Sequence, residues 1–227
     1  MARHGNSRHL NRLASSTYPR VSKKISKYIA KPAAGRHALG RSIALVVLVR
    51  DKLGLAATAG EVRKIINAGG VQVNGRLAVD DRYPLGFGDV VTFAGSKESY
   101  SIGIDKAGNI KLDKASGRAG SRTLKVVGKY VGRGNKVMLR LYDGSTVKGE
   151  AATKVNDSVV LNEKGIGSVL KFEKGARCLV IAGTHASERG VIKEVKQGNA
   201  TSLASVKIEG EGGAFETPAE NIMVIGA

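Results

Sequence analysis

The chain has 227 residues, with 37 Lys or Arg against 19 Asp or Glu, and its formal net charge at pH 7 is +18. Hydrophobic residues make up 42% of the sequence, which is enough for packed cores and excludes disorder along the whole chain. No apolar run approaches the roughly 20 residues that span a membrane, and the N-terminus lacks the apolar core of a secretion signal. We therefore expect a cytoplasmic protein of about one to three small domains whose partner is a polyanion.

The first segment, residues 1–41, is a basic arm with too few apolar residues for a core of its own. Residues 1–50 contain eleven Lys or Arg and no Asp or Glu, whereas a merely solvated surface mixes charges of both signs. We expect the arm to become ordered on its partner and to place these side chains against phosphates: Arg3, Arg8, Arg12, Arg20, Lys23, Lys24, Lys27, Lys31, Arg36 and Arg41. Aromatic rings between these cations either stack on exposed RNA bases or pack on the folded body: Tyr18, Tyr28, His4, His9 and His37.

The segment after the arm predicts two helices and a hairpin in one compact domain. Ser42 can cap a first helix that runs to about Leu53. Thr58 and Glu61 have capping-box spacing at the start of a second helix. The dipeptide at 74–75, Asn-Gly, is the strongest short signal for a hairpin turn. A closing strand follows at 90–94, so two helices, a hairpin and a strand make one compact α+β unit.

The second helix and the hairpin of this domain carry polar side chains with no acid among them. They are Arg63, Lys64 and Asn67 on the polar face of the helix, and Gln72, Asn74 and Arg76 on the hairpin. A phosphate backbone is recognised by positioned cations and amide donors, so these side chains are candidate RNA contacts. A helix face that is simply solvated remains the alternative.

At this point the sequence resembles a known family. A resemblance to the alpha-L RNA-binding domain runs through LVVLVRDKLGLAATAGEVRKIINAGGVQVNGR. A fuller resemblance, to the archaeal and eukaryotic small-subunit ribosomal protein family S4e, is carried in order by HLNRLASSTYPR, GRHALGRSIALVVLVRDKLGLA and YPLGFGDVVTF. The resemblance implies an α+β protein in which an extended basic arm precedes three domains. These are a helix-helix-hairpin RNA-binding domain at 42–95, a central β domain at 96–172 and an SH3-like KOW barrel at 173–227.

The residues after Glu98 form short β runs separated by glycines, which is typical of a small β barrel or sandwich. The stretch 128–136 is basic and rich in glycine, so RNA can approach its backbone closely. Its candidate RNA contacts are Lys129, Arg133 and Lys136. A plain flexible loop explains the same stretch equally well.

The last segment resembles a KOW motif, in which a loop joins two strands of an SH3-like barrel. The strands are expected at 178–182 and 191–195, with the loop beginning at Gly183. The candidate RNA contacts here are His185, Arg189 and Lys193. KOW barrels also bind proteins, so the sequence leaves open whether this barrel contacts RNA or protein.

The sequence carries no set of residues that indicates catalysis. Three of the four histidines lie in the arm, and the single cysteine, Cys178, lies in an apolar run. Clustered metal ligands and the Lys-Ser/Thr of a phosphate-binding loop are also lacking. We expect a protein that is not an enzyme and has no catalytic residue, metal, cofactor or small-molecule substrate.

Taken with the charge, the resemblance implies a structural constituent of the small ribosomal subunit in the cytoplasm. Its expected partners are small-subunit rRNA, bound through the arm and the alpha-L domain, and neighbouring ribosomal proteins, with no membrane contact. The alternatives are an RNA-modifying enzyme, or a translation or transcription factor that carries alpha-L and KOW modules. Neither a catalytic Asp nor a cofactor-binding glycine turn follows residue 98, which disfavours the enzyme.

Overall fold

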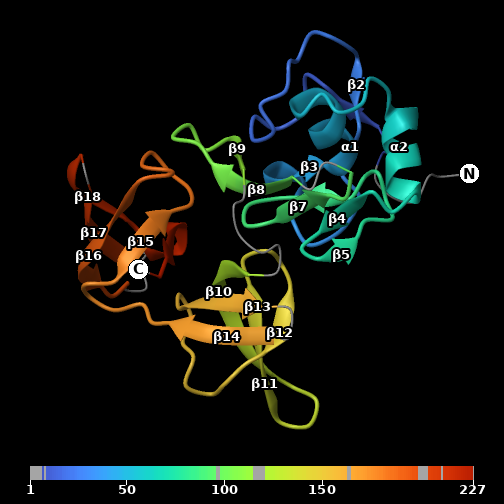
Figure 1. Cartoon of the computed structure of the whole chain (residues 1–227). Helices are drawn as coiled ribbons and strands as arrows, with labels where there is room; N and C mark the ends of the chain where they lie inside the picture. The colour runs from blue at the N-terminus through green and yellow to red at the C-terminus, as the bar shows by residue number, and fades with distance from the viewer. Residues whose placement is uncertain are drawn as a thin grey trace, which may run out of the picture. The chain divides into compact units, whose positions relative to one another are not determined.

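The computed structural model describes residues 7, 9–95, 98–114, 121–162, 165–198, 204–210 and 212–226. The chain divides into two compact units (Figure 1). Unit 1 comprises residues 1–102 and 112–119, and unit 2 comprises residues 103–111 and 120–227. None of the helices in these ranges is long and apolar enough to cross a membrane.

The protein is mostly β, and the predicted α+β class is wrong. Of the described residues, 42% lie in strands and 11% in helices, and the α-helices among them are two short ones. They are α1 (Leu45–Val47) and α2 (Ala59–Asn67). More residues lie in strands than in helices because the chain after residue 98 forms successive antiparallel strand pairs.

The segment predicted as the first helix, 42–53, is helical from residue 45 to residue 52, and most of that part is a π-helix. It begins as strand β3 (Ile43–Ala44), which pairs with β6 (Pro84–Leu85). The N–H groups of the next two residues, 45 and 46, donate to the carbonyls of Tyr83 and Asp81, so a distant loop supplies the partners at this point of the chain. After α1 the chain widens into a π-helix, η2 (Leu48–Lys52), which ends this segment.

The second helix and the hairpin form as predicted. Thr58 accepts a hydrogen bond from the N–H of Glu61 (3.2 Å), and the Glu61 carboxylate accepts one from the N–H of Thr58 (3.4 Å). Asn74 and Gly75 turn the hairpin with φ angles of 53° and 77°, in the left-handed region that a tight turn requires. A five-stranded sheet of order β5-β4-β7-β8-β9 follows, with strands β4 (Val71–Val73), β5 (Arg76–Leu77), β7 (Val90–Phe93), β8 (Ser99–Ile104) and β9 (Ile110–Lys114).

The arm is not extended, which corrects a second part of the predicted architecture. Strand β1 (Leu10–Asn11) pairs with β2 (Tyr28–Ile29), so the arm folds back on itself, and a short 3-10 helix, η1 (Leu39–Arg41), ends it (blue in Figure 1). Lysine side chains hold this fold by donating to backbone oxygens: Lys23 to Ser15 (2.8 Å) and Lys31 to Ser7 (2.7 Å). Polar anchoring thus replaces the apolar core that the arm lacks.

A buried polar network joins the end of the arm to the hairpin of unit 1. Asp89, with 1% of its surface exposed, bonds through Oδ2 to Nε2 of His37 (2.8 Å) and accepts from the N–H of Gly86 (3.1 Å). Its Oδ1 accepts from Nδ2 of Asn74 (2.7 Å). Burial disfavours the ionised carboxylate, but these hydrogen bonds and the neighbouring His37 together hold the pKa of Asp89 below its ordinary value. His37 therefore packs on the folded body, which was one of its two predicted roles.

Unit 2 contains two five-stranded antiparallel sheets, each with its own core. The first, of order β12-β11-β10-β13-β14, is made of β10 (Arg122–Gly132), β11 (Lys136–Leu141), β12 (Thr146–Lys148), β13 (Ser158–Asn162) and β14 (Gly165–Leu170). The second, of order β18-β17-β16-β15-β19, is made of β15 (Arg177–Val180), β16 (Arg189–Lys196), β17 (Ser205–Gly210), β18 (Gly213–Pro218) and, after the 3-10 helix η3 (Ala219–Asn221), β19 (Ile222–Val224).

These two sheets are bonded to each other by buried polar groups. Lys125, on β10, donates from Nζ to the carbonyls of Ala219 (2.6 Å) and Glu220 (3.0 Å), and burial lowers the pKa of Lys125 to about 8. The hydroxyl of Ser158 accepts from the N–H of Val224 (3.0 Å). We refer below to the sheet of β10–β14 as the central sheet and to that of β15–β19 as the C-terminal sheet.

We predict that Asp89→Ala lowers the free energy of unfolding of the protein by about 3 kcal/mol, because the substitution leaves buried donors without an acceptor. Guanidinium denaturation followed by circular dichroism measures the change. The folded-state pKa of Asp89 is depressed, so its contribution is complete above about pH 4 and is lost as the pH falls through the folded value. Glu173→Ala, at an exposed position, is the control and should change stability by less than about 0.5 kcal/mol. Equal effects of the two substitutions would contradict the role of the network.

Candidate nucleic-acid interface

A cationic hollow of about 440 Å³ lies in unit 1, where the folded arm meets η2. We call it the arm hollow, and its walls are Arg12, Arg20, Val21, Ser22, Ile25 and Ser26 from the arm and Arg50, Asp51, Lys52 and Ala57 from η2 and the turn after it. Four of these side chains are cationic and one is acidic. The chain thus brings together two basic segments that are about thirty residues apart in sequence.

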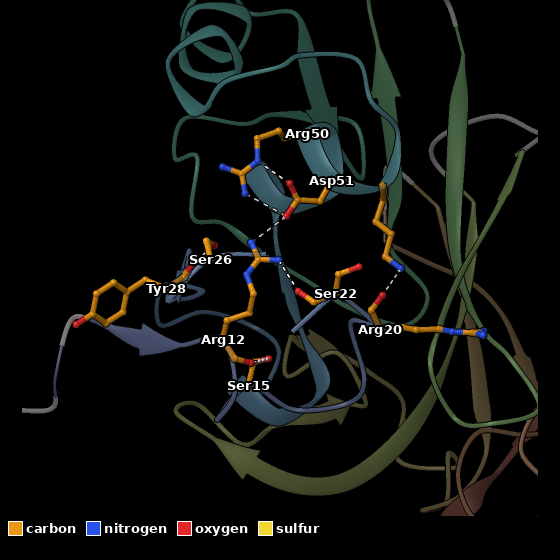
Figure 2. Close-up of polar contacts among 9 residues, drawn as sticks. Arg12, Ser15, Arg20, Ser22, Ser26, Tyr28, Arg50 and Asp51 are labelled. Atoms are coloured by element: carbon orange, nitrogen blue, oxygen red, sulfur yellow. Dashed lines mark hydrogen bonds and ion pairs between the residues drawn. The ribbon is translucent and has the colours of Figure 1, made fainter. Parts of the chain in front are cut away.

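Arg12 connects the arm to η2 through a buried guanidinium (Figure 2). Its Nη1 donates to the carbonyl of Ser22 (2.8 Å), which closes the arm on itself. Its Nη2 lies 3.7 Å from Oδ2 of Asp51. Only 4% of the residue surface is exposed, so removing Arg12 would take a partner from both segments at once.

The single acid of the arm hollow is already neutralised by arginine. Asp51 accepts from Nε of Arg50 (2.6 Å) and from Nη2 of Arg50 (3.0 Å), a fork geometry that favours both charges. The hydrogen bond to Asp51 raises the pKa of Arg50. Arg12 lies on the other side of Asp51, so this carboxylate is paired with two guanidinium groups.

A second hydrogen bond between η2 and the arm brings two cationic residues close together. Nζ of Lys52 donates to the backbone carbonyl of Arg20 (2.9 Å). Burial, and next the nearby charge of Arg20, lower the pKa of Lys52. An anion in the hollow relieves this repulsion, which makes the site suited to a phosphate group.

The other predicted arm residues differ in how far they face solvent. Arg20, Lys24, Lys27 and Arg41 are exposed, while Lys23, Lys31 and Arg36 are half-buried. Nζ of Lys27 lies 5.4 Å from the ring centroid of Tyr28, and the Tyr28 ring contacts that of His9. Arg3 and Arg8, which the sequence also singled out, lie outside the described residues.

On the helix and hairpin of unit 1, three of the six predicted side chains are exposed and make no hydrogen bond or ion pair among the described residues: Lys64, Asn67 and Arg76. Arg63 forms an ion pair with Asp81 (2.8 Å), a partner that the helical pattern could not reveal. The side chain of Asn74 donates a hydrogen bond to Asp89 and accepts one from the N–H of Val90. Gln72 is half-buried. The structure therefore divides this group into surface residues and residues that hold the fold.

In the central sheet, Lys129 folds back and donates to the carbonyls of Ala151 and Thr153. Arg133 and Lys136 are exposed at the tip of the β10–β11 hairpin, where Gly134 and Asn135 have φ angles of 75° and 56°. A glycine and an asparagine suit this turn because they tolerate the left-handed region. The tip thus presents two of its three predicted cations to solvent.

In the C-terminal sheet, glutamates pair with the lysines. Lys193, one of the predicted residues, bonds to Glu209 (2.7 Å), and two further pairs are Lys196–Glu216 (3.1 Å) and Lys207–Glu194 (3.3 Å). His185 stacks on Phe215 at 4.1 Å and lies 3.3 Å from a Glu188 carboxylate oxygen, while Arg189 is exposed. The sequence counted these lysines as cations, but the strand register gives each an acidic neighbour.

Comparisons with known proteins match this arrangement. Residues 45–91 match the S4 domain, and residues 96–165 match ribosomal family S4e. The chain is 37% identical to small ribosomal subunit protein eS4 of Archaeoglobus fulgidus, over 96% of this chain and 93% of that protein. It is 34% identical to the eS4 protein of Methanocella arvoryzae, over 96% of this chain and 94% of that one. The crystal structure of 30S ribosomal protein S4e from Thermoplasma acidophilum is 27% identical and superposes with a TM-score of 0.69, covering 82% of this chain and 96% of that chain.

We predict that Arg12→Met loosens the arm without unfolding the domain beneath it, because Asp51 keeps Arg50 as a partner. Trypsin should then cut after Lys23 or Lys24 at least about tenfold faster, since a buried charge contact that favours the closed arm is lost. Limited proteolysis with mass spectrometry measures the rate. Arg63→Met breaks an ion pair outside the arm and is the matched control. Arm cleavage at the same rate in both variants would show that Arg12 does not hold the arm.

Proposed function

This chain belongs to ribosomal family S4e, and we propose that it is a structural constituent of the small ribosomal subunit that binds rRNA through its arm and its S4 domain. The family membership rests on 37% identity over nearly the full length of a relative named as a small ribosomal subunit protein. The observation that carries the mode of binding is the arm hollow. There, Arg20, Arg50 and Lys52 line one concave surface whose only acid is neutralised.

Phosphates are the part of RNA that this hollow suits. Cations placed on two fixed segments can neutralise neighbouring phosphates and release their counterions, which is the main source of affinity in such complexes. Unit 1 offers RNA cations at fixed positions, which contact phosphates. The bases of an A-form helix are out of reach of such side chains, because their edges lie in a narrow major groove. Specificity therefore comes from the folded shape of the rRNA, which the rigid pairing of arm and S4 domain can match.

The remaining partners follow from the family and from the charges. A constituent of the small subunit works in the ribosome, in the cytoplasm, beside other ribosomal proteins. The C-terminal sheet, with its lysines paired to glutamates, is less attractive to a polyanion than the arm hollow is. This supports a protein neighbour for the C-terminal sheet, one of the two partners that the sequence left open.

We assign no catalytic activity to the chain. The family consists of structural ribosomal proteins, and no relative described above is named as an enzyme. The only thiol, Cys178, is buried in the C-terminal core, and burial raises its pKa to about 11, so it stays protonated and unreactive at neutral pH. Nothing observed favours the RNA-modifying alternative.

We predict that the double substitution Arg20→Gln and Lys52→Gln weakens binding to small-subunit rRNA about tenfold at 0.15 M salt, with a shallower salt dependence. The slope of log K against log salt should fall by about 0.7 to 0.9 for each phosphate contact removed. Fluorescence anisotropy over a salt series measures both quantities.

The control is Lys193→Gln with Lys207→Gln, which removes the same net charge from lysines that already have glutamate partners. It should leave the slope within error of the wild type. Equal slopes for the two double variants would mean that total charge, not the arm hollow, determines binding.

A further inference from the structure

One face of the central sheet combines an exposed aromatic ring with several cations. In the register of β10 and β11, Tyr130 lies opposite Met138, and Met138 lies opposite Lys148 of β12. Residues that oppose one another across antiparallel strands point to the same face. Tyr130, Met138 and Lys148 therefore form a row on the face turned away from the core residues Leu139 and Leu141.

The Tyr130 ring has no side chain beside it on its own strand. Gly128 and Gly132 stand two residues before and after it, on the same face, and add no side chain there, while Met138 packs over Gly132. Half of the Tyr130 surface is exposed (50%), although the strand around it is fully paired. An exposed aromatic ring flanked by two glycines is a flat surface on which another ring can stack.

Cations surround this ring, and they outnumber the one acid of this part of the sheet, Glu150, which follows β12 at the register position opposite Lys136. Gly132 lies opposite Lys136 and Gly128 opposite Arg140, so these two side chains lie on either side of the row of Tyr130. Strands β10, β11 and β12 contain no Asp or Glu. Among the described residues, Lys136, Arg140 and Lys148 form no ion pair, whereas three lysines of the C-terminal sheet each pair with a glutamate.

We propose that this face, made of Tyr130, Met138, Lys136, Arg140 and Lys148, binds an unpaired RNA nucleotide. The base stacks on Tyr130 and Met138, and the cations neutralise the phosphates on either side of it. Bases can stack in this way only where the RNA is single-stranded or bulged, since paired bases are already stacked on each other. The site adds base contacts in unit 2 to the phosphate contacts of the arm hollow.

RNA is favoured over an acidic protein segment by the ring and the charge together. Uncompensated cations attract either partner, but an aromatic ring kept clear by two glycines adds a contact that every nucleobase can use. The proposal rests on the proposed function only in taking RNA as the partner. It differs in the kind of RNA bound, an unpaired nucleotide, and in the place of binding, the central sheet.

The test uses the full chain with single-stranded RNA that contains 4-thiouridine, and ultraviolet crosslinking followed by mass spectrometry. The crosslink is expected on the peptide that contains Tyr130. Tyr130→Ala should lower the crosslink yield and weaken single-strand binding at least about fivefold, by the same factor at every salt concentration, because stacking releases no counterions. Tyr130→Phe keeps the ring and should bind like the wild type.

Two controls separate this site from general binding. Val131→Ala alters an exposed residue of the same strand that points to the opposite face, and it should change nothing. Arg140→Gln should reduce the salt slope by about 0.7, as expected for one phosphate contact on a single strand. Circular dichroism confirms that each variant is folded.

If Tyr130→Ala binds single strands like the wild type while the arm variants lose affinity, the Tyr130 site is refuted and the proposed function stands. A Tyr130 face that crosslinks to a protein of the subunit instead of RNA also refutes the site. A chain that binds no rRNA at any salt concentration would instead refute the proposed function.

Discussion

The folded arm of unit 1 depends on one charge contact, the approach of the buried Arg12 guanidinium to Asp51. The arm has no apolar core, and its positive charges repel one another, so the folded arm requires compensating interactions. Arg12 supplies two of them by bonding the arm to itself at Ser22 and to η2 at Asp51. The same contact neutralises the acid that would otherwise repel a phosphate. One interaction therefore orders the arm and prepares its surface for an anion.

The distribution of paired and unpaired charges divides the chain more sharply than net charge does. In the C-terminal sheet, cross-strand glutamates neutralise lysines at separations of 2.7 to 3.3 Å. In the arm hollow and on the outer face of the central sheet, cations outnumber acids. A charge of +18 spread evenly would attract RNA everywhere. The pairing instead makes the C-terminal sheet less attractive to RNA than these two surfaces are.

Local signals in the sequence predicted the elements that depend on neighbouring residues. The capping box of Thr58 and Glu61, the turn at 74–75 and the β character after residue 98 all formed as expected. The helix predicted at 42–53 begins only at residue 45, because residues 43–46 find backbone partners in residues 81–85, which local periodicity does not show. The contact between Arg12 and Asp51 could not be predicted for the same reason, because the two residues are 39 positions apart in the sequence. Likewise, Tyr130 and Lys148 share a face only through the register of three strands.

A density map of the small ribosomal subunit that contains this chain tests the central claim most directly. The account predicts the arm folded against η2, with Arg12 buried and with the side chains of Arg20 and Lys52 about 3 Å from rRNA phosphate oxygens. An arm hollow that faces bulk solvent, or that is filled by a neighbouring protein, would contradict it.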